Sequence, residues 1–172
     1  MKHLIAIIAS GLMTISLHAQ GIGASFLDKY GKDDGIEVIT IGKKMLDLML
    51  SDSIASPEMQ DAIAGLESIQ VISSNDTILN KNYYHSAFNL LAKSKNFVEL
   101  LALNSETDNL LIMIKESKGV VSELVLLSNT EGHFNLICLR GNIRLEMIAK
   151  YSQQIDLKEL KKLKFLKNNI AD

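Results

Sequence analysis

Residues 97–141 read FVELLALNSETDNLLIMIKESKGVVSELVLLSNTEGHFNLICLRG, and this stretch decides the fold of the chain. Its apolar runs are Phe97–Leu103, Leu110–Lys115, Val120–Leu127 and Phe134–Leu139. The segments between the runs are short and polar, and two of them end in glycine. Short turns of this composition between apolar runs are typical of β-hairpins. The stretch therefore predicts four consecutive antiparallel strands, with the rest of the chain packed on or around them.

The four consecutive strands form a β-meander. The residues before this meander predict two more strands and several helices. The two segments rich in β-branched residues, which favour strands, are Gly35–Ile41 and Leu66–Ser73. Helical spacing or helix-start residues are found at Phe26–Tyr30, at Lys43–Leu50, from Pro57 to Gly65, and from Asp76, as the cap, to about Ser94. Gly21–Ser25 is small and flexible in composition, and we expect a disordered lead there.

Two of these helices have a recognisable apolar side. Met45 and Met49 are expected on the core side of the helix that starts at Lys43. In the helix before the meander, the core side is expected from the spacing i, i+4, i+7 of Tyr84, Phe88 and Leu91.

Together these elements predict an α+β fold. We expect a two-layer, mainly antiparallel sheet, made of the four-strand meander and two earlier strands, with helices packed on it. Several strands are apolar on both faces: in 120–127, Val121 and Val125 alternate with Leu124 and Leu126. A sheet with one face in water alternates more cleanly. The second face is therefore expected to be covered by another helix, by the N-terminal segment, or by a second molecule in a homodimer.

The first nineteen residues have the anatomy of a secretory signal peptide. Lys2 and His3 precede an apolar run from Leu4 to Leu17, and Ala19 offers a small residue before Gln20 opens the mature chain. The apolar run is shorter than the roughly 20 residues of a transmembrane helix. The alternatives are an uncleaved anchor or a buried N-terminal helix. The chain is thus divided into a signal peptide, residues 1–19, and a single α+β domain, residues 20–172.

The signal peptide predicts that the domain is exported, periplasmic or secreted, and the positions of cysteine predict that it is not lipid-anchored. No cysteine lies near the cleavage point, so a lipid-anchored mature N-terminus is not expected. The net charge of −2 becomes −3 when Lys2 is removed, and only two arginines are present, Arg140 and Arg144, so no nucleic-acid partner is expected. Each arginine is expected to pair with an acid, or alternatively to form an anion site before the next helix. The single cysteine, Cys138, lies within an apolar run and is expected to be buried.

The chemistry of the mature chain does not point to an active site. Its histidines are His85, on a predicted helix, and His133, in a predicted turn. A hydrolase triad would need one of them near a nucleophile and a carboxylate, and no Gly-x-Ser-x-Gly segment is present. One cysteine and two separated histidines do not make a recognised metal site, and no cofactor motif is found. We predict no catalytic, cofactor or metal residues.

The last segment, residues 155–172, predicts a basic amphipathic helix. Its leucines recur every three residues, at Leu157, Leu160, Leu163 and Leu166, with lysines around them. Such a helix docks on the domain with its lysines in water, or alternatively touches an anionic membrane surface. We expect docking.

Several short segments, spread over nearly all of the mature chain, resemble one known family. They are Phe26-x-Asp28-Lys29-Tyr30, Gly35-Ile36-x-Val38, Lys44-Met45, Glu67–Ser73, Glu116–Gly119, Ser122–Leu127, Gly141-Asn142-Ile143 and Ile148-Ala149-Lys150. They are similar to the DUF4252 proteins of Bacteroidetes, which are small exported or lipoprotein-like chains. The resemblance implies a Gram-negative envelope as the setting, and no catalytic residue is carried over, since the family has no catalytic motif. Many members look lipid-anchored, and this chain departs from them by lacking the cysteine.

The same resemblance suggests a modification. Envelope proteins of Bacteroidetes carry O-glycans at Asp-Ser/Thr-apolar tripeptides, and two segments fit, with Ser53 and Thr77 as the acceptors.

The sequence thus predicts an exported envelope protein that acts by binding or assembly, without enzyme activity. The expected partner is an unknown protein or a second copy of the chain. The alternatives are an accessory protein in envelope-stress signalling and a hydrolase built on Ser, Tyr and acidic residues.

Overall fold

The computed structural model describes residues 21–51 and 56–144 of the chain. Ser53, the cleavage point after Ala19 and the helix predicted at 155–172 lie outside the described residues. The elements, in chain order, are α1 (Ile22–Tyr30), β1 (Glu37–Gly42), α2 (Lys43–Ser51), α3 (Pro57–Ile63), β2 (Leu66–Ser74), α4 (Asn80–Lys93), β3 (Phe97–Asn104), β4 (Asn109–Ser117), β5 (Val120–Thr130) and β6 (His133–Ile143). Within this part, none of the helices has the length and apolar character that crossing a bilayer requires.

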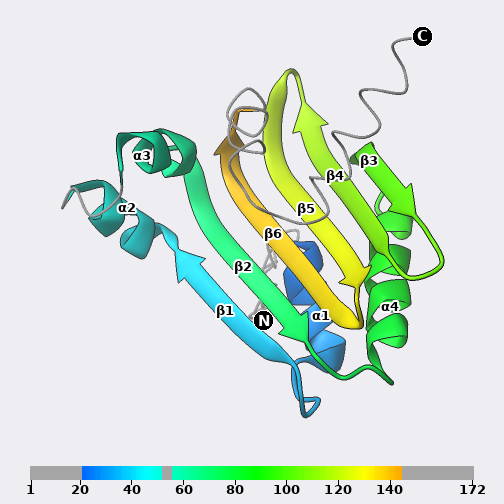
Figure 1. Cartoon of the computed structure of the whole chain (residues 1–172). Coiled ribbons are helices and arrows are strands. Elements are labelled where there is room, and N and C mark those ends of the chain that lie inside the picture. Colours follow the sequence, from blue (N-terminus) through cyan, green and yellow to red (C-terminus); the bar gives the residue numbers. More distant parts are fainter. Residues whose placement is uncertain (1–20, 52–55, 145–172) are drawn as a thin grey trace, which may run out of the picture.

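The strands form one antiparallel sheet in the order β1-β2-β6-β5-β4-β3 (Figure 1). The four-strand meander and the two earlier strands are therefore confirmed, and so is the α+β class. The first two strands join the meander through its last strand, because β2 pairs with β6. Sequence order does not show this neighbour, since α4 and three strands separate β2 from β6 along the chain.

Two tight turns set the register of the meander. Lys118 and Gly119 connect β4 to β5 with φ of 54° and 80°, and Glu131 and Gly132 connect β5 to β6 with φ of 51° and 79°. Two consecutive positive φ angles are the signature of a type I′ turn, whose twist matches that of the strands. Glycine at the second position allows this conformation at no steric cost.

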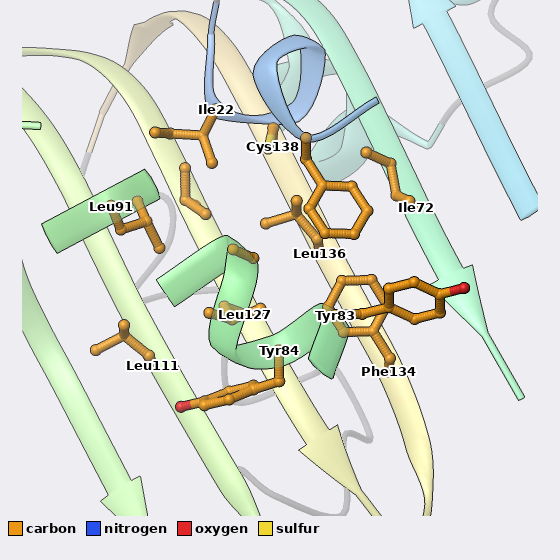
Figure 2. Close-up of a cluster of buried hydrophobic side chains, with 13 residues drawn as sticks. Ile22, Ile72, Tyr83, Tyr84, Leu91, Leu111, Leu127, Phe134, Leu136 and Cys138 are labelled. Carbon is orange, nitrogen blue, oxygen red and sulfur yellow. The ribbon is translucent and has the colours of Figure 1, made fainter. Parts of the chain in front are cut away.

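One face of the sheet is covered by α1 and α4. The larger hydrophobic core lies between these two helices and the sheet (Figure 2). Four aromatic rings meet there: Phe26 stacks on Phe134 with ring centroids 5.3 Å apart, and Tyr83 lies edge-on to both Phe26 and Tyr30. Phe26 and Phe134 are fully buried. The other buried members of this core are Ile22, Ile72, Tyr84, Ala87, Leu91, Leu111, Val125, Leu127, Leu136 and Cys138.

The prediction of a disordered lead at Gly21–Ser25 is wrong. These residues belong to α1 and to its N-cap, Gly21, and Gly21 and Gly23 are buried against the sheet. A Cβ atom on Gly23 would lie 2.0 Å from Gln70 Oε1 and 3.2 Å from Cys138 Sγ. The small residues that suggested flexibility instead allow the helix to approach the sheet closely.

The predicted core sides of two helices are also corrected. In α2 the buried residue is Leu46 and Met45 is 56% exposed, while Met49 packs against the smaller core as predicted. In α4 the core side consists of Tyr83, Tyr84, Ala87 and Leu91, and Phe88 is 43% exposed. Adjacent apolar residues in a helix point about 100° apart, so sequence spacing left the choice between neighbours open, and packing decided it.

One predicted cap and the end of the last strand differ as well. Asp76 accepts hydrogen bonds from the backbone N–H groups of Ile78 and Leu79, so it caps the turn before α4, and the helix itself begins at Asn80. The last strand extends beyond the apolar run that ends at Leu139, because β6 continues to Ile143.

The other face of the sheet, here called the second face, is covered in part by α2 and α3. Figure 1 shows these helices at one end of the sheet, near β1 and β2, while α1 and α4 lie behind it. Leu46 and Ile63 from these helices form a smaller core with sheet residues such as Leu124. The prediction that another helix covers the second face is therefore confirmed for this end of the sheet.

The aromatic core provides a test of the fold. We expect Phe26→Ala to lower the free energy of unfolding by about 3–5 kcal/mol, since it removes a fully buried ring and leaves a cavity. Phe88→Ala, on the exposed side of α4, is the matched control and should cost less than about 1 kcal/mol. Urea unfolding followed by circular dichroism measures both, and equal losses would contradict this assignment of the core.

Candidate functional site

The second face carries two continuous rows of aliphatic side chains that cross all six strands. In the strand order of the sheet, the first aliphatic row consists of Ile39, Val71, Ile137, Leu126, Ile112 and Leu101, each directly opposite the next. The second aliphatic row consists of Ile41, Ile69, Leu139, Leu124, Ile114 and Val98. Opposite residues of antiparallel strands share a face, so each row is a continuous apolar strip.

The two rows differ in what covers them. Five members of the second row, all except Val98, belong to or pack against the smaller core under α2 and α3. In the described part of the chain, Ile112 is the only member of the first row that packs against either core. Ile39 is 61% exposed, and the other members are half-buried. The first aliphatic row is therefore the candidate binding surface.

Polar residues border the first aliphatic row at the end away from α2. Glu37, Ser73, Asn135 and Ser128 are successive cross-strand neighbours there. Three of them, Glu37, Ser73 and Asn135, line a hollow of about 430 Å³, together with Asn75, Thr130, Glu131 and His133. This gives the second face an apolar strip with a polar margin, which is the anatomy of a protein-binding surface.

The two histidines lie in different surroundings. In the hollow, the Nδ1 atom of His133 is 2.7 Å from the Oδ1 atom of Asn75, and the carboxylates of Glu37 and Glu131 line the same hollow. His85 is exposed on α4, with its ring against Tyr84 at a centroid distance of 5.9 Å.

A second polar site is buried at the start of α1. Glu123 is 5% exposed, and its Oε1 atom accepts a hydrogen bond from the Ile22 N–H at 3.1 Å. The positive end of the helix dipole stabilises a carboxylate at this position. Lys115 and Arg140 are its direct cross-strand neighbours on β4 and β6, so two basic residues flank the buried charge.

Cys138 and Glu123 line a small cavity with a volume of about 210 Å³. The prediction that this cysteine is buried is confirmed, at 3% exposure. Burial, reinforced by the nearby Glu123 carboxylate, raises the pKa of the Cys138 thiol to about 12. Since the thiolate is the nucleophile, this cysteine is protonated and unreactive at neutral pH.

The remaining predicted positions are distributed over the surface. Thr77 is exposed in the turn before α4, beside Ile78, which is 83% exposed. Arg144 forms an ion pair with Asp61, which confirms acid pairing for this arginine. Among residues 21–51 and 56–144, no three or more His, Cys, Asp or Glu side chains come together to hold a metal ion.

Sequence reasoning found the apolar alternation that builds the rows, and it missed the rows themselves. Each row depends on the β2–β6 pairing, which no local signal shows. It also missed Glu123, because a lone acid between apolar residues has no motif until α1 is placed next to it.

Comparison with known proteins gives one match. A family model described as a domain of unknown function, DUF4252, matches residues 30–151. No curated protein and no solved structure matches the chain.

The buried acid at the start of α1 yields a prediction. Glu123→Gln keeps the shape of the side chain and removes the charge that faces the helix N-terminus, so we expect the free energy of unfolding at pH 7 to fall by about 1–2 kcal/mol. Glu99→Gln, at an exposed position on β3, is the control and should change it by less than about 0.5 kcal/mol. Equal stability of Glu123→Gln and the unaltered chain in urea would refute the role of this charge.

Proposed function

The chain belongs to the DUF4252 family, a domain of unknown function, and we propose that it is an exported envelope protein that binds a partner through the first aliphatic row. The partner is a protein that presents an apolar surface of its own. The proposal gives the chain a binding or assembly role and assigns it no reaction.

The observation that carries the proposal is the continuity of the row. Six aliphatic side chains, one from each strand, form a strip across the whole sheet, and Ile39, Val71, Ile137, Leu126 and Leu101 lie outside both cores of the described part. Removing such side chains from water contributes roughly 25 cal/mol per Å² of apolar surface, so a partner that covers the strip gains affinity from it. Contiguous apolar strips with polar margins mark interaction sites more often than they serve the fold alone.

Export is supported by the sequence before the domain. Residues 1–19 combine a basic start, an apolar run and a small residue at the cleavage point.

Protein isolated from its native host tests export and modification together. We expect it in the envelope or extracellular fraction, with an intact mass that corresponds to a chain starting at Gln20. A sugar on Thr77, whose side chain is exposed, would appear as added mass that Thr77→Ala removes. A full-length chain in the cytoplasmic fraction would overturn export, and a mass without added sugar would remove the glycan hypothesis.

Site-specific photo-cross-linking in the host tests the binding surface. A benzophenone amino acid at position 137, in the first aliphatic row, should yield an adduct of higher mass on illumination. The same group at Asn82, exposed on α4 on the other side of the sheet, is the control and should yield none. If positions 137 and 126 both give no adduct, the first aliphatic row is not the binding surface.

A further inference from the structure

The two edges of the sheet are built differently. Strand β1 pairs with β2 from Glu37 to Gly42 without a register shift, and it contains neither proline nor lysine. Strand β3, at the other edge, has an irregularity between Glu99 and Leu101 in its pairing with β4. Bulges, charges and prolines are the means by which proteins block pairing at an edge strand. β1 has one charge, Glu37, at its first residue and none of these features in Val38–Gly42, and among the described residues no strand pairs with its outer side.

Exposed apolar side chains gather at the same edge. Nine large hydrophobic side chains are exposed in the described part of the chain, and four of them fall within residues 38–48. Val38 and Ile39 are 43% and 61% exposed on opposite faces of β1, and Met45 and Leu48 are 56% and 46% exposed on α2. Figure 1 shows α2 at the β1 side of the sheet. The edge therefore offers backbone hydrogen bonds and apolar contacts at once.

We infer that β1 pairs antiparallel with β1 of a second copy of this chain, which joins the two sheets into one continuous sheet of twelve strands. Opposite residues of an antiparallel pair share a face, so Ile39 can only lie opposite an odd-numbered residue of the partner. This restricts a two-fold pairing to a few registers, centred on a single residue of the strand.

Charge complementarity selects the register centred on Thr40. In it Ile39 lies opposite the partner's Ile41, and Thr40 faces the partner's Thr40. Glu37 then comes next to the partner's Lys43, the first residue of α2, whose exposed ion pair with Asp47 opens to receive the Glu37 carboxylate. Every contact except that between the two Thr40 residues occurs twice, so two Glu–Lys pairs flank the centre of the interface. Centring on Ile39 would instead place the Glu37 carboxylate against the partner's Ile41, where its charge is unpaired. The Thr40 register also sets Val38 opposite the partner's Gly42, around whose Cβ position the structure has open space.

This pairing goes beyond the binding role proposed for the first aliphatic row, because it uses the backbone groups of the β1 edge and shares only Ile39 with that row. It also extends that row, since Ile39 of one copy lies beside the partner's Ile41 on the same face. The aliphatic rows of the two copies then form one continuous apolar surface across the β1–β1 interface. A failure of the pairing would leave the cross-linking test at position 137 unaffected, so the two proposals can fail separately.

Light scattering of the purified protein with matched edge variants tests the pairing. We expect a mass twice that of the monomer for the unaltered chain and for Val98→Lys, and the monomer mass for Ile39→Lys. Both positions are exposed β-branched residues on edge strands, at 57% and 61%, so both variants should keep the circular dichroism spectrum of the folded chain. A monomeric unaltered chain, or a dimer that Val98→Lys dissociates and Ile39→Lys does not, would overturn the inference.

Disulfide trapping tests the register. Opposite residues in an antiparallel pair have Cα atoms about 4.5–5.5 Å apart, within the range that a disulfide spans. We therefore expect Thr40→Cys to give a covalent dimer on mild oxidation. The unaltered chain is the background control, because its Cys138 is buried with a pKa of about 12, and Val98→Cys controls for random collision. Trapping of Ile39→Cys in preference to Thr40→Cys would overturn the register centred on Thr40.

Discussion

The structure depends on strand β5, which is apolar on both faces and lies between β4 and β6. Val125 and Leu127 are fully buried on the face covered by α1 and α4, while Leu124 and Leu126 point to the second face. A strand of this composition cannot leave either face in water without losing much of the hydrophobic free energy that stabilises the sheet. Helices therefore pack on both sides of the sheet, and the second face is where their coverage is incomplete.

The buried polar groups Glu123 and Cys138 lie where α1 packs on the sheet. Glu123 receives the N–H of Ile22 at the start of α1, and its charge is flanked by Lys115 and Arg140, so it fixes where the helix begins. Cys138 lies beside it and is kept protonated by the same burial.

Interactions between residues that are close along the chain could be predicted from the sequence, and interactions between distant residues could not. The meander was predictable because each hairpin is formed by neighbouring residues, and two of the three are closed by two-residue turns such as Lys118-Gly119. The strand bounds came out short: β5, for instance, continues past Leu127 to Thr130. Alternation identifies a strand by its apolar residues and overlooks the polar ones at its ends.

The features that could not be predicted all depend on residues far apart in the chain. From the sequence, Gly23 suggests a flexible segment. In the structure, the side chain of Gln70 on β2 occupies the place where a Cβ atom on Gly23 would lie. The choice between Met45 and Leu46 as the core residue of α2 depends on where β2 lies under that helix. The first aliphatic row combines residues of β1 and β2 with those of the meander, and only the pairing of β2 with β6 brings them together. The candidate site is thus less predictable than the fold, since it is a property of strand order.

The same strand order has a consequence for how the domain forms. β2 pairs with β6, which is the last strand along the described part of the chain. The β1–β2 pair therefore cannot join the sheet until residues 133–143 are available. Contacts of high sequence separation form late, because loop closure costs entropy before they contribute stability. The three hairpins of the meander are formed by neighbouring residues, so they can form first and provide the template on which β2, and then β1, pairs.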